Sequence, residues 1–245
     1  MIPCIIATAR TGSSYISYLM YKIGKDKFHY KNYLNEYFTV QELFQADYEK
    51  IDNVVQLIFS KRTNSKWFDD ARRIKLDRLN LLKNDTSYAF KIFAEDIEPE
   101  IDNYITKNFT PIFLERRNKI DQFISFSHML STNTASYDID DNAVINEITV
   151  KQEHIQLFFN HIKNYTRYKN NYKGRSKTLY YEDFMNSEDQ IEFIAKILNV
   201  VNFPEDIFFN SKKTPYIDEP ESLIANKTEW ACIKMILKHV LQNVK

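Results

Sequence analysis

The sequence predicts an α/β protein, a single domain with a parallel sheet flanked by helices. Short apolar segments alternate along the chain with longer segments of helical period, which is the pattern of parallel strands joined by crossover helices. The 245 residues are 44% hydrophobic, enough for one substantial core, and no linker rich in proline, glycine or serine divides them. We therefore expect one domain over residues 1–245.

Four brief and mostly apolar segments are the expected strands. They cover residues 2–7, 87–93, 110–114 and 177–181. Between the first two strands, apolar residues spaced three and four apart from Val40 to Ile58 predict a long amphipathic helix. Further helices are expected over residues 66–83, 118–132, 150–172 and 228–243, with a loop over 133–146. Ser187–Gln190 predicts a capping box that opens a helix running to Leu198.

The composition indicates which classes of partner and which cellular compartment to expect. Thirty-three basic residues balance thirty-three acidic ones, so no bulk charge favours nucleic acid or an anionic membrane. The two cysteines, Cys4 and Cys232, have neither metal-type nor redox-type spacing. Since no apolar run reaches about 18 residues and no signal-peptide pattern opens the chain, we expect a cytoplasmic protein without a membrane span. The sequence makes no prediction of oligomeric state.

A polar turn follows the first strand and leads directly into a helix. A helix N-terminus presents unpaired N–H groups and partial positive charge, which suit a phosphate. Gly12, one of three glycines in the chain, has no side chain to keep an anion from the backbone. The sequence therefore predicts a phosphate-binding loop, and ordinary N-capping of the helix is the alternative. Its residues are Arg10, Thr11, Gly12, Ser13 and Ser14.

A second candidate anion site follows the strand at 110–114. Arg117 stands at the carboxyl end of this strand, where open parallel sheets bind their ligands, and Ser125 comes eight residues later on the next helix. Eight residues make about two helical turns, so one phosphate can be gripped by the guanidinium and the hydroxyl together. The alternative is that Arg117 lies in a solvated helix start and Ser125 only fills a helix interior.

These two segments, together with Tyr180–Phe184, resemble the sulfotransferases that use 3′-phosphoadenosine 5′-phosphosulfate (PAPS). The chain is most similar to the bacterial carbohydrate branch, of the trehalose sulfotransferase type. That branch shares an Arg-Thr-Gly-Ser first loop and an Arg-x-Lys-x-x-Gln-x-x-Ser second segment, which runs here from Arg117 to Ser125. The resemblance implies a P-loop nucleotide-kinase-like fold, in which Arg10–Ser14 cradle the 5′-phosphosulfate. Arg117 and Ser125 hold the 3′-phosphate by the same likeness.

The resemblance also implies catalytic residues. A Glu-Tyr-Phe segment after the first helix of these enzymes corresponds to Glu36 and its neighbours, so Glu36 is the candidate base, and His29 is the second choice. Arg10 stabilises the leaving phosphate. Lys212 or Lys213, in a segment similar to the family's variable loop, neutralises a phosphate, and the choice between them is open.

The expected activity is transfer of a sulfuryl group from PAPS to a hydroxyl of a carbohydrate or small glycoconjugate, without a metal. A P-loop nucleotide or small-molecule kinase is one alternative, although the Gly-x-x-x-x-Gly-Lys-Ser/Thr pattern is absent. A non-catalytic nucleotide binder on the same fold is the other alternative.

Overall fold

The centre of the molecule is a parallel β-sheet. A computed structural model describes residues 2–23, 65–84, 90–132, 147–187, 189–198 and 220–242. Within them, four strands lie in the order β2-β1-β3-β4. The strands are β1 (Ile2–Ala7), β2 (Phe90–Phe93), β3 (Phe109–Glu115) and β4 (Lys177–Tyr180). The predicted α/β class, with a parallel sheet flanked by helices, is confirmed.

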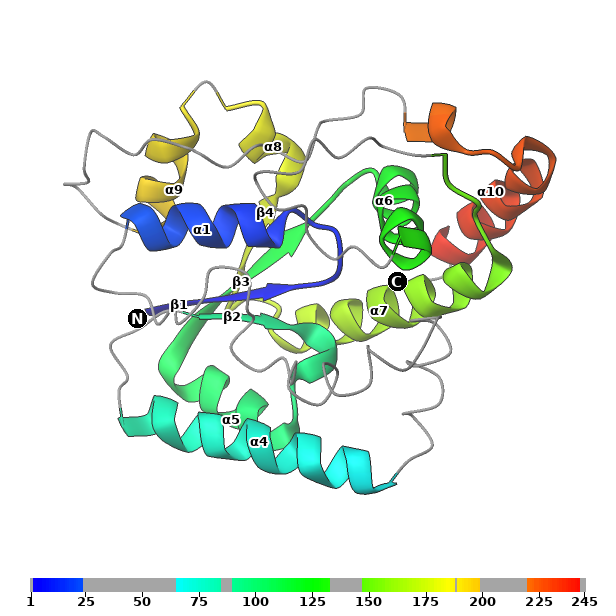
Figure 1. Cartoon of the computed structure of the whole chain (residues 1–245). Coiled ribbons are helices and arrows are strands. Elements are labelled where there is room, and N and C mark those ends of the chain that lie inside the picture. Colours follow the sequence, from blue (N-terminus) through cyan, green and yellow to red (C-terminus); the bar gives the residue numbers. More distant parts are fainter. Residues whose placement is uncertain are drawn as a thin grey trace.

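Helices cover both faces of the sheet (Figure 1). One face carries α1 (Ser13–Ile23), α8 (Tyr181–Met185) and α9 (Gln190–Leu198). The other carries α4 (Ser65–Asn84), α5 (Pro99–Asn108) and the second half of α7 (Gln152–Asn171). Beyond the carboxyl ends of the strands, α6 (Lys119–Thr132) packs with the first half of α7 and with α10 (Lys227–Gln242). Short 3-10 turns, η1 (Ala94–Asp96) and η2 (Pro220–Leu223), complete the described elements.

The central strands are continuously apolar because both of their faces are buried. Successive side chains of β1 point to opposite faces. Ile5 and Ala7 join the apolar cluster beneath α1 and α9, whereas Cys4 and Ile6 join the cluster of α4, α5 and α7. An alternating pattern of apolar and polar residues would leave one of these clusters incomplete.

The strand order has a topological switch point between β1 and β3. The chain moves from β1 to β2 in one direction across the sheet and from β3 to β4 in the other, so the strand order reverses between the adjacent strands β1 and β3. The pairing of Ile6 with Phe113 brings the ends of these strands side by side. Ligands of open α/β sheets bind at such a point, outside the carboxyl ends of the strands. The two loops singled out in the sequence both start there.

Several elements differ from the sequence prediction. Helix α5 was not predicted, although Pro99 opens it and Ile101 and Ile105 form its buried face. The strand predicted over 177–181 ends at Tyr180, and Tyr181 begins α8. The helix predicted from 40 to 58 and the loop at 133–146 lie outside the described residues. Among the described helices, none is long and apolar enough to cross a bilayer.

The predicted capping box at Ser187 is wrong. Helix α9 begins at Gln190, and its cap is Asp189, whose Oδ1 accepts the N–H of Glu192 at 2.8 Å. The Ser187 hydroxyl instead donates to the carbonyl of Asp189 at 3.0 Å. Asp189 lies three residues before Glu192 and therefore takes the position from which a side chain reaches the third N–H of a helix.

Candidate functional site

The loop after β1 has a strained backbone conformation, which contacts with the surrounding residues stabilise. Arg10 has φ 63° and Gly12 has φ 74°, so both lie in the left-handed region. A non-glycine residue adopts this region rarely and keeps it only where neighbouring contacts fix the chain. The buried Thr11 supplies one such contact, because its hydroxyl donates to the carbonyl of Thr8 at 2.9 Å.

One face of α6 supplies two further contacts to the same loop. Gln122 Nε2 donates to the carbonyl of Ala9 at 2.7 Å, and Arg10 Nε donates to Ser125 Oγ at 2.9 Å. Gln122 and Ser125 stand three residues apart on the helix, so their side chains are neighbours. Arg10 and Ser125, which the sequence placed in separate anion sites, are thereby in direct contact.

Gly12 lies where the loop enters α1. Its carbonyl accepts the N–H of Ile16 at 3.1 Å, and no acidic residue occupies the first turn of the helix. The positive end of α1 is therefore not neutralised by an acidic side chain of its own first turn, which favours an anion at this position. Ser13 is buried, whereas the side chain of Ser14 lies outside the described residues.

The ring of Tyr181 covers Gly12. A Cβ atom added at Gly12 would lie 2.5 Å from both Cδ2 and Cε2 of Tyr181. Arg116 lies over the same ring, with its guanidinium carbon 5.2 Å from the ring centroid. Tyr181 thus connects the loop after β1 with the loop after β3.

Arg117 is bound to the start of α8. Both of its terminal nitrogens contact the carboxylate of Asp183, with Nη2 at 2.7 Å from Oδ2, and its guanidinium lies 4.0 Å from the centroid of the Tyr180 ring. Glu182 accepts the backbone N–H groups of Arg117 and Asn118 at 3.0 and 3.1 Å. The hydrogen bond from Arg117 lowers the pKa of Asp183 below its ordinary value.

The two predicted partners of one phosphate therefore have different neighbours. Arg117 contacts Asp183, and Ser125 contacts Arg10. Arg117 is also half exposed, with 49% of its side-chain surface accessible. Its joint grip with Ser125 on a phosphate stays a prediction. Gly12 and Arg117 nonetheless lie at the same edge of the sheet, since Tyr180 and Tyr181 join them.

Three residues on α6 belong to this site but were not predicted as site residues. Gln122 holds Ala9, and Lys119 Nζ lies 3.4 Å from the amide oxygen of Gln122. Burial lowers the pKa of Lys119. His128 is buried one turn beyond Ser125, and its pKa is lowered first by burial and then by the charge of Arg10. In the sequence, the regular spacing of three residues from Lys119 through Gln122 and Ser125 to His128 could have indicated that these polar side chains share one face of the helix.

Four of the predicted site residues lie outside the described residues: Glu36, His29, Lys212 and Lys213. Their roles stay predictions. The described residues contain no cluster of three His, Cys, Asp or Glu side chains that could hold a metal ion.

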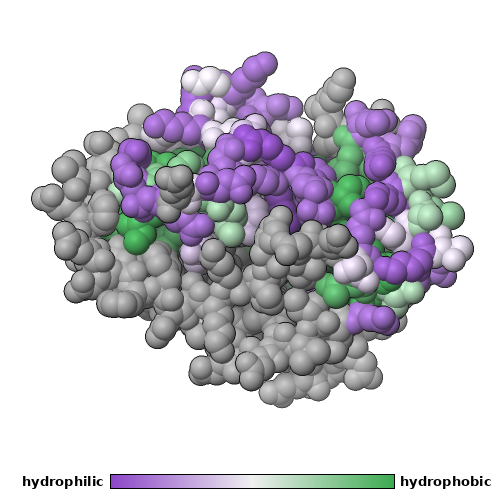
Figure 2. Space-filling model, turned by 90° about the horizontal axis from the view of Figure 1, so that it is seen from above, coloured by the Kyte–Doolittle hydropathy of each residue, from purple (hydrophilic) through white to green (hydrophobic). Residues whose placement is uncertain are grey.

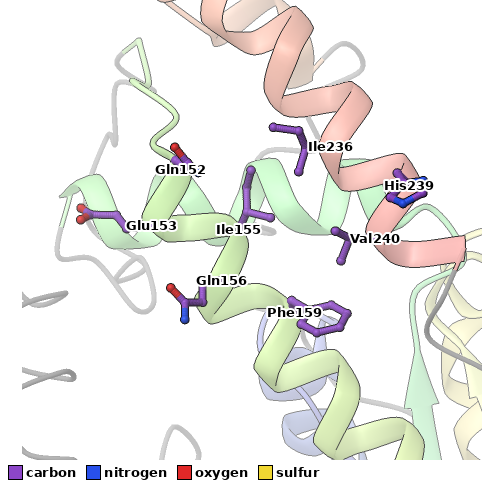
Figure 3. Close-up of a pocket in the computed structure, with 8 residues that line it drawn as sticks. All are labelled: Gln152, Glu153, Ile155, Gln156, Phe159, Ile236, His239 and Val240. Atoms are coloured by element: carbon purple, nitrogen blue, oxygen red, sulfur yellow. The ribbon is translucent and has the colours of Figure 1, made fainter.

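A groove of about 670 Å³ lies elsewhere, between α7 and α10 (Figure 3). Ile155 and Phe159 of α7 face Ile236 and Val240 of α10 across it. It shares no residue with the loops after β1 and β3. In contrast, the face that carries α8 is hydrophilic along its middle, with apolar residues toward both sides (Figure 2).

The two loops and the face of α6 that binds the first of them form one polar, donor-rich edge at the switch point of the sheet. Such an edge suits a ligand with more than one anionic group. Neither a protein-family model nor a curated protein nor a solved structure matches the chain significantly.

Proposed function

We propose that this chain is a PAPS-dependent sulfotransferase that sulfates a hydroxyl of a carbohydrate or small glycoconjugate, on a P-loop nucleotide-kinase-like fold. The observation that carries the proposal is the contact between Arg10 and Ser125. It joins the loop after β1 to the helix after β3 at the point where the strand order reverses. A nucleotide with a phosphate at each end of its ribose requires two anion sites in this relation.

The 5′-phosphosulfate is assigned to Arg10, Thr11, Gly12, Ser13 and Ser14. The first turn of α1 offers N–H donors to this group, while the space that the missing side chain of Gly12 leaves is filled by the ring of Tyr181. Negative charge develops on the 5′-phosphate as the sulfuryl group leaves, and Arg10 would stabilise it.

The 3′-phosphate is assigned to Arg117 and Ser125. The Ser125 hydroxyl accepts a bond from Arg10, and its own hydrogen, for which the described residues provide no acceptor, would donate to a phosphate oxygen. Arg117 would exchange Asp183 for the phosphate. Because this ion pair is half exposed and screened by solvent, its loss costs little stability. Lys212 or Lys213 would add a further positive charge.

The transfer itself also needs a base for the acceptor hydroxyl. The hydroxyl oxygen attacks sulfur in line with the bridging oxygen of the 5′-phosphate, and the bond to that oxygen breaks. The resemblance to the carbohydrate sulfotransferases implies Glu36 as the base, with His29 as the second candidate.

The test is a mass-spectrometric assay for added sulfate. The chain is incubated with PAPS and, in separate reactions, with glucose, galactose, N-acetylglucosamine and trehalose. We expect a sulfated product from at least one sugar, and strongly reduced product with Arg117→Ala because the donor binds less tightly. If no sugar is sulfated, and ATP with magnesium stabilises the chain while 3′,5′-adenosine bisphosphate does not, a kinase replaces the proposal.

A further inference from the structure

A lysine at the start of α6 carries a charge that no ion pair of the described residues balances. Lys119 is the first residue of the helix, and its side chain is partly buried. Among the described residues, its Nζ has one hydrogen-bond acceptor, Oε1 of Gln122, at 3.4 Å, which is long for such a bond. An ammonium group has three donors, and lysines withdrawn from water are usually paired. Lys119 therefore has both charge and donors left for a ligand.

The carboxylates around Lys119 are bound to other groups. Glu115 pairs with Lys169 at 3.0 Å, and Glu182 accepts two backbone N–H groups of the loop after β3. Burial is the largest effect on the pKa of Lys119 and lowers it. Glu115 and Glu182 raise this pKa less strongly, and Lys169 and Arg116 lower it again. An anion bound at Nζ would therefore stabilise the charged form of the side chain.

The amide of Gln122 connects Lys119 to the loop after β1. Gln122 is fully buried, and its Nε2 donates to the carbonyl of Ala9 at 2.7 Å. Because a carbonyl only accepts and an ammonium group only donates, these two contacts determine which way the amide points. One side-chain amide thus separates Nζ of Lys119 from the backbone of the loop. Ser125, which accepts from Arg10 at 2.9 Å, follows Gln122 by three residues on the same helix.

Arg117, the other cation assigned to this end of the nucleotide, has a stronger partner in the structure. Both of its terminal nitrogens contact the carboxylate of Asp183. Arg117 must exchange this carboxylate for a phosphate, whereas Lys119 gives up only a neutral amide oxygen at 3.4 Å. Of these two cations, Lys119 is the one that can bind a phosphate beside Ser125 without breaking an ion pair of the described residues.

We propose that Lys119 is a third ligand of the 3′-phosphate, to which its ammonium group donates beside the hydroxyl of Ser125. The inference rests on the proposed nucleotide site and adds a residue to it. When the nucleotide binds, Nζ moves from Oε1 of Gln122 to a phosphate oxygen, while Gln122 keeps its bond to Ala9. Lys119 is thereby a determinant of specificity for nucleotides that carry a 3′-phosphate.

Calorimetric titrations with two nucleotides test the inference, because 3′,5′-adenosine bisphosphate has the 3′-phosphate and 5′-AMP lacks it. Lys119→Met removes the charge and keeps an apolar side chain of similar length. It is expected to weaken binding of the bisphosphate about 10- to 100-fold and to leave binding of 5′-AMP unchanged. Lys119→Arg keeps a cation and is expected to retain part of the affinity. Lys163→Met, at an exposed lysine of α7, changes the net charge equally and is expected to bind both nucleotides as the native chain does.

Two outcomes overturn the inference and leave the proposed function standing. In one, Lys119→Met binds the bisphosphate as tightly as the native chain. In the other, it loses equal affinity for both nucleotides, so that Lys119 acts only through Gln122 and the loop after β1. If Lys119→Met does not fold, Lys119→Gln takes its place and is judged by the same two outcomes. If the native chain does not bind 3′,5′-adenosine bisphosphate, the proposed function itself fails.

Discussion

Gly12→Ala tests how closely the loop after β1 is packed. Gly12 has φ 74°, and an added Cβ would lie 2.5 Å from two atoms of the Tyr181 ring. Gly174 provides a matched control, because it has φ 82° but no atom within 4 Å of an added Cβ. Both substitutions carry the cost of a left-handed alanine, and only Gly12→Ala adds the clash.

The left-handed backbone and the clash with Tyr181 lower the free energy of unfolding by different amounts. An L-residue in the left-handed region costs roughly 1–2 kcal/mol, which is the whole expected effect of Gly174→Ala. Overpacking a well-filled site adds typically about 1–3 kcal/mol, so Gly12→Ala is expected to cost about 2–5 kcal/mol. Removing the ring with Tyr181→Ala should return the cost of Gly12→Ala to that of Gly174→Ala.

The assay is urea unfolding followed by circular dichroism, with the free energy of unfolding extrapolated to water. The native chain, Gly12→Ala, Gly174→Ala, Tyr181→Ala and the double variant at 12 and 181 complete the cycle. The packing account is refuted if both alanines cost the same in the native background, or if Tyr181→Ala leaves the cost of Gly12→Ala unchanged.

Three further substitutions test the site and the core. Ser125→Ala removes the acceptor of the Arg10 hydrogen bond and should lower the free energy of unfolding by about 1 kcal/mol; an unchanged urea midpoint would contradict that contact. Asp183→Asn weakens the ion pair of Arg117 and should raise the affinity for 3′,5′-adenosine bisphosphate severalfold at low salt, whereas a loss of affinity in calorimetry would count against the proposed exchange. Burial, and less strongly the charge of Lys151, lower the pKa of His154 from 6.5 to about 4. The unfolded chain therefore binds this proton more tightly, and stability falls as the pH drops from about 6.5 to about 4, by roughly 3 kcal/mol in all. His154→Gln should flatten that part of the stability curve, and an unchanged slope would contradict the assignment.

The parts of the fold that local pattern determines were predictable. The apolar runs of β1 and β3 identified the central strands because both faces of each strand are buried. The predicted helix at 118–132 matches α6, and the loops at Arg10 and Arg117 fall at the strand ends where they were expected. Helix α5 carried a proline start and two isoleucines four residues apart, but its ten residues give too few periods for a helical pattern to stand out.

The contacts that form the site depend on strand order, which local pattern does not contain. Asp183 binds Arg117 across 66 residues of chain, and Arg10 donates to Ser125 across 115 residues. Only the arrangement β2-β1-β3-β4 brings the ends of these strands to one edge. The prediction of the N-cap of α9 was wrong because Ser187 and Asp189 are both favourable N-cap residues and lie only two residues apart in the sequence.

The central claim is that the loops after β1 and β3 bind one nucleotide together. Calorimetric titration of 3′,5′-adenosine bisphosphate into the native chain, Arg10→Ala and Arg117→Ala tests it most directly. The account predicts one molecule bound per chain, no displacement by ATP with magnesium, and binding at least tenfold weaker in each variant. Absence of binding to the native chain, or equal affinity in all three proteins, would contradict it.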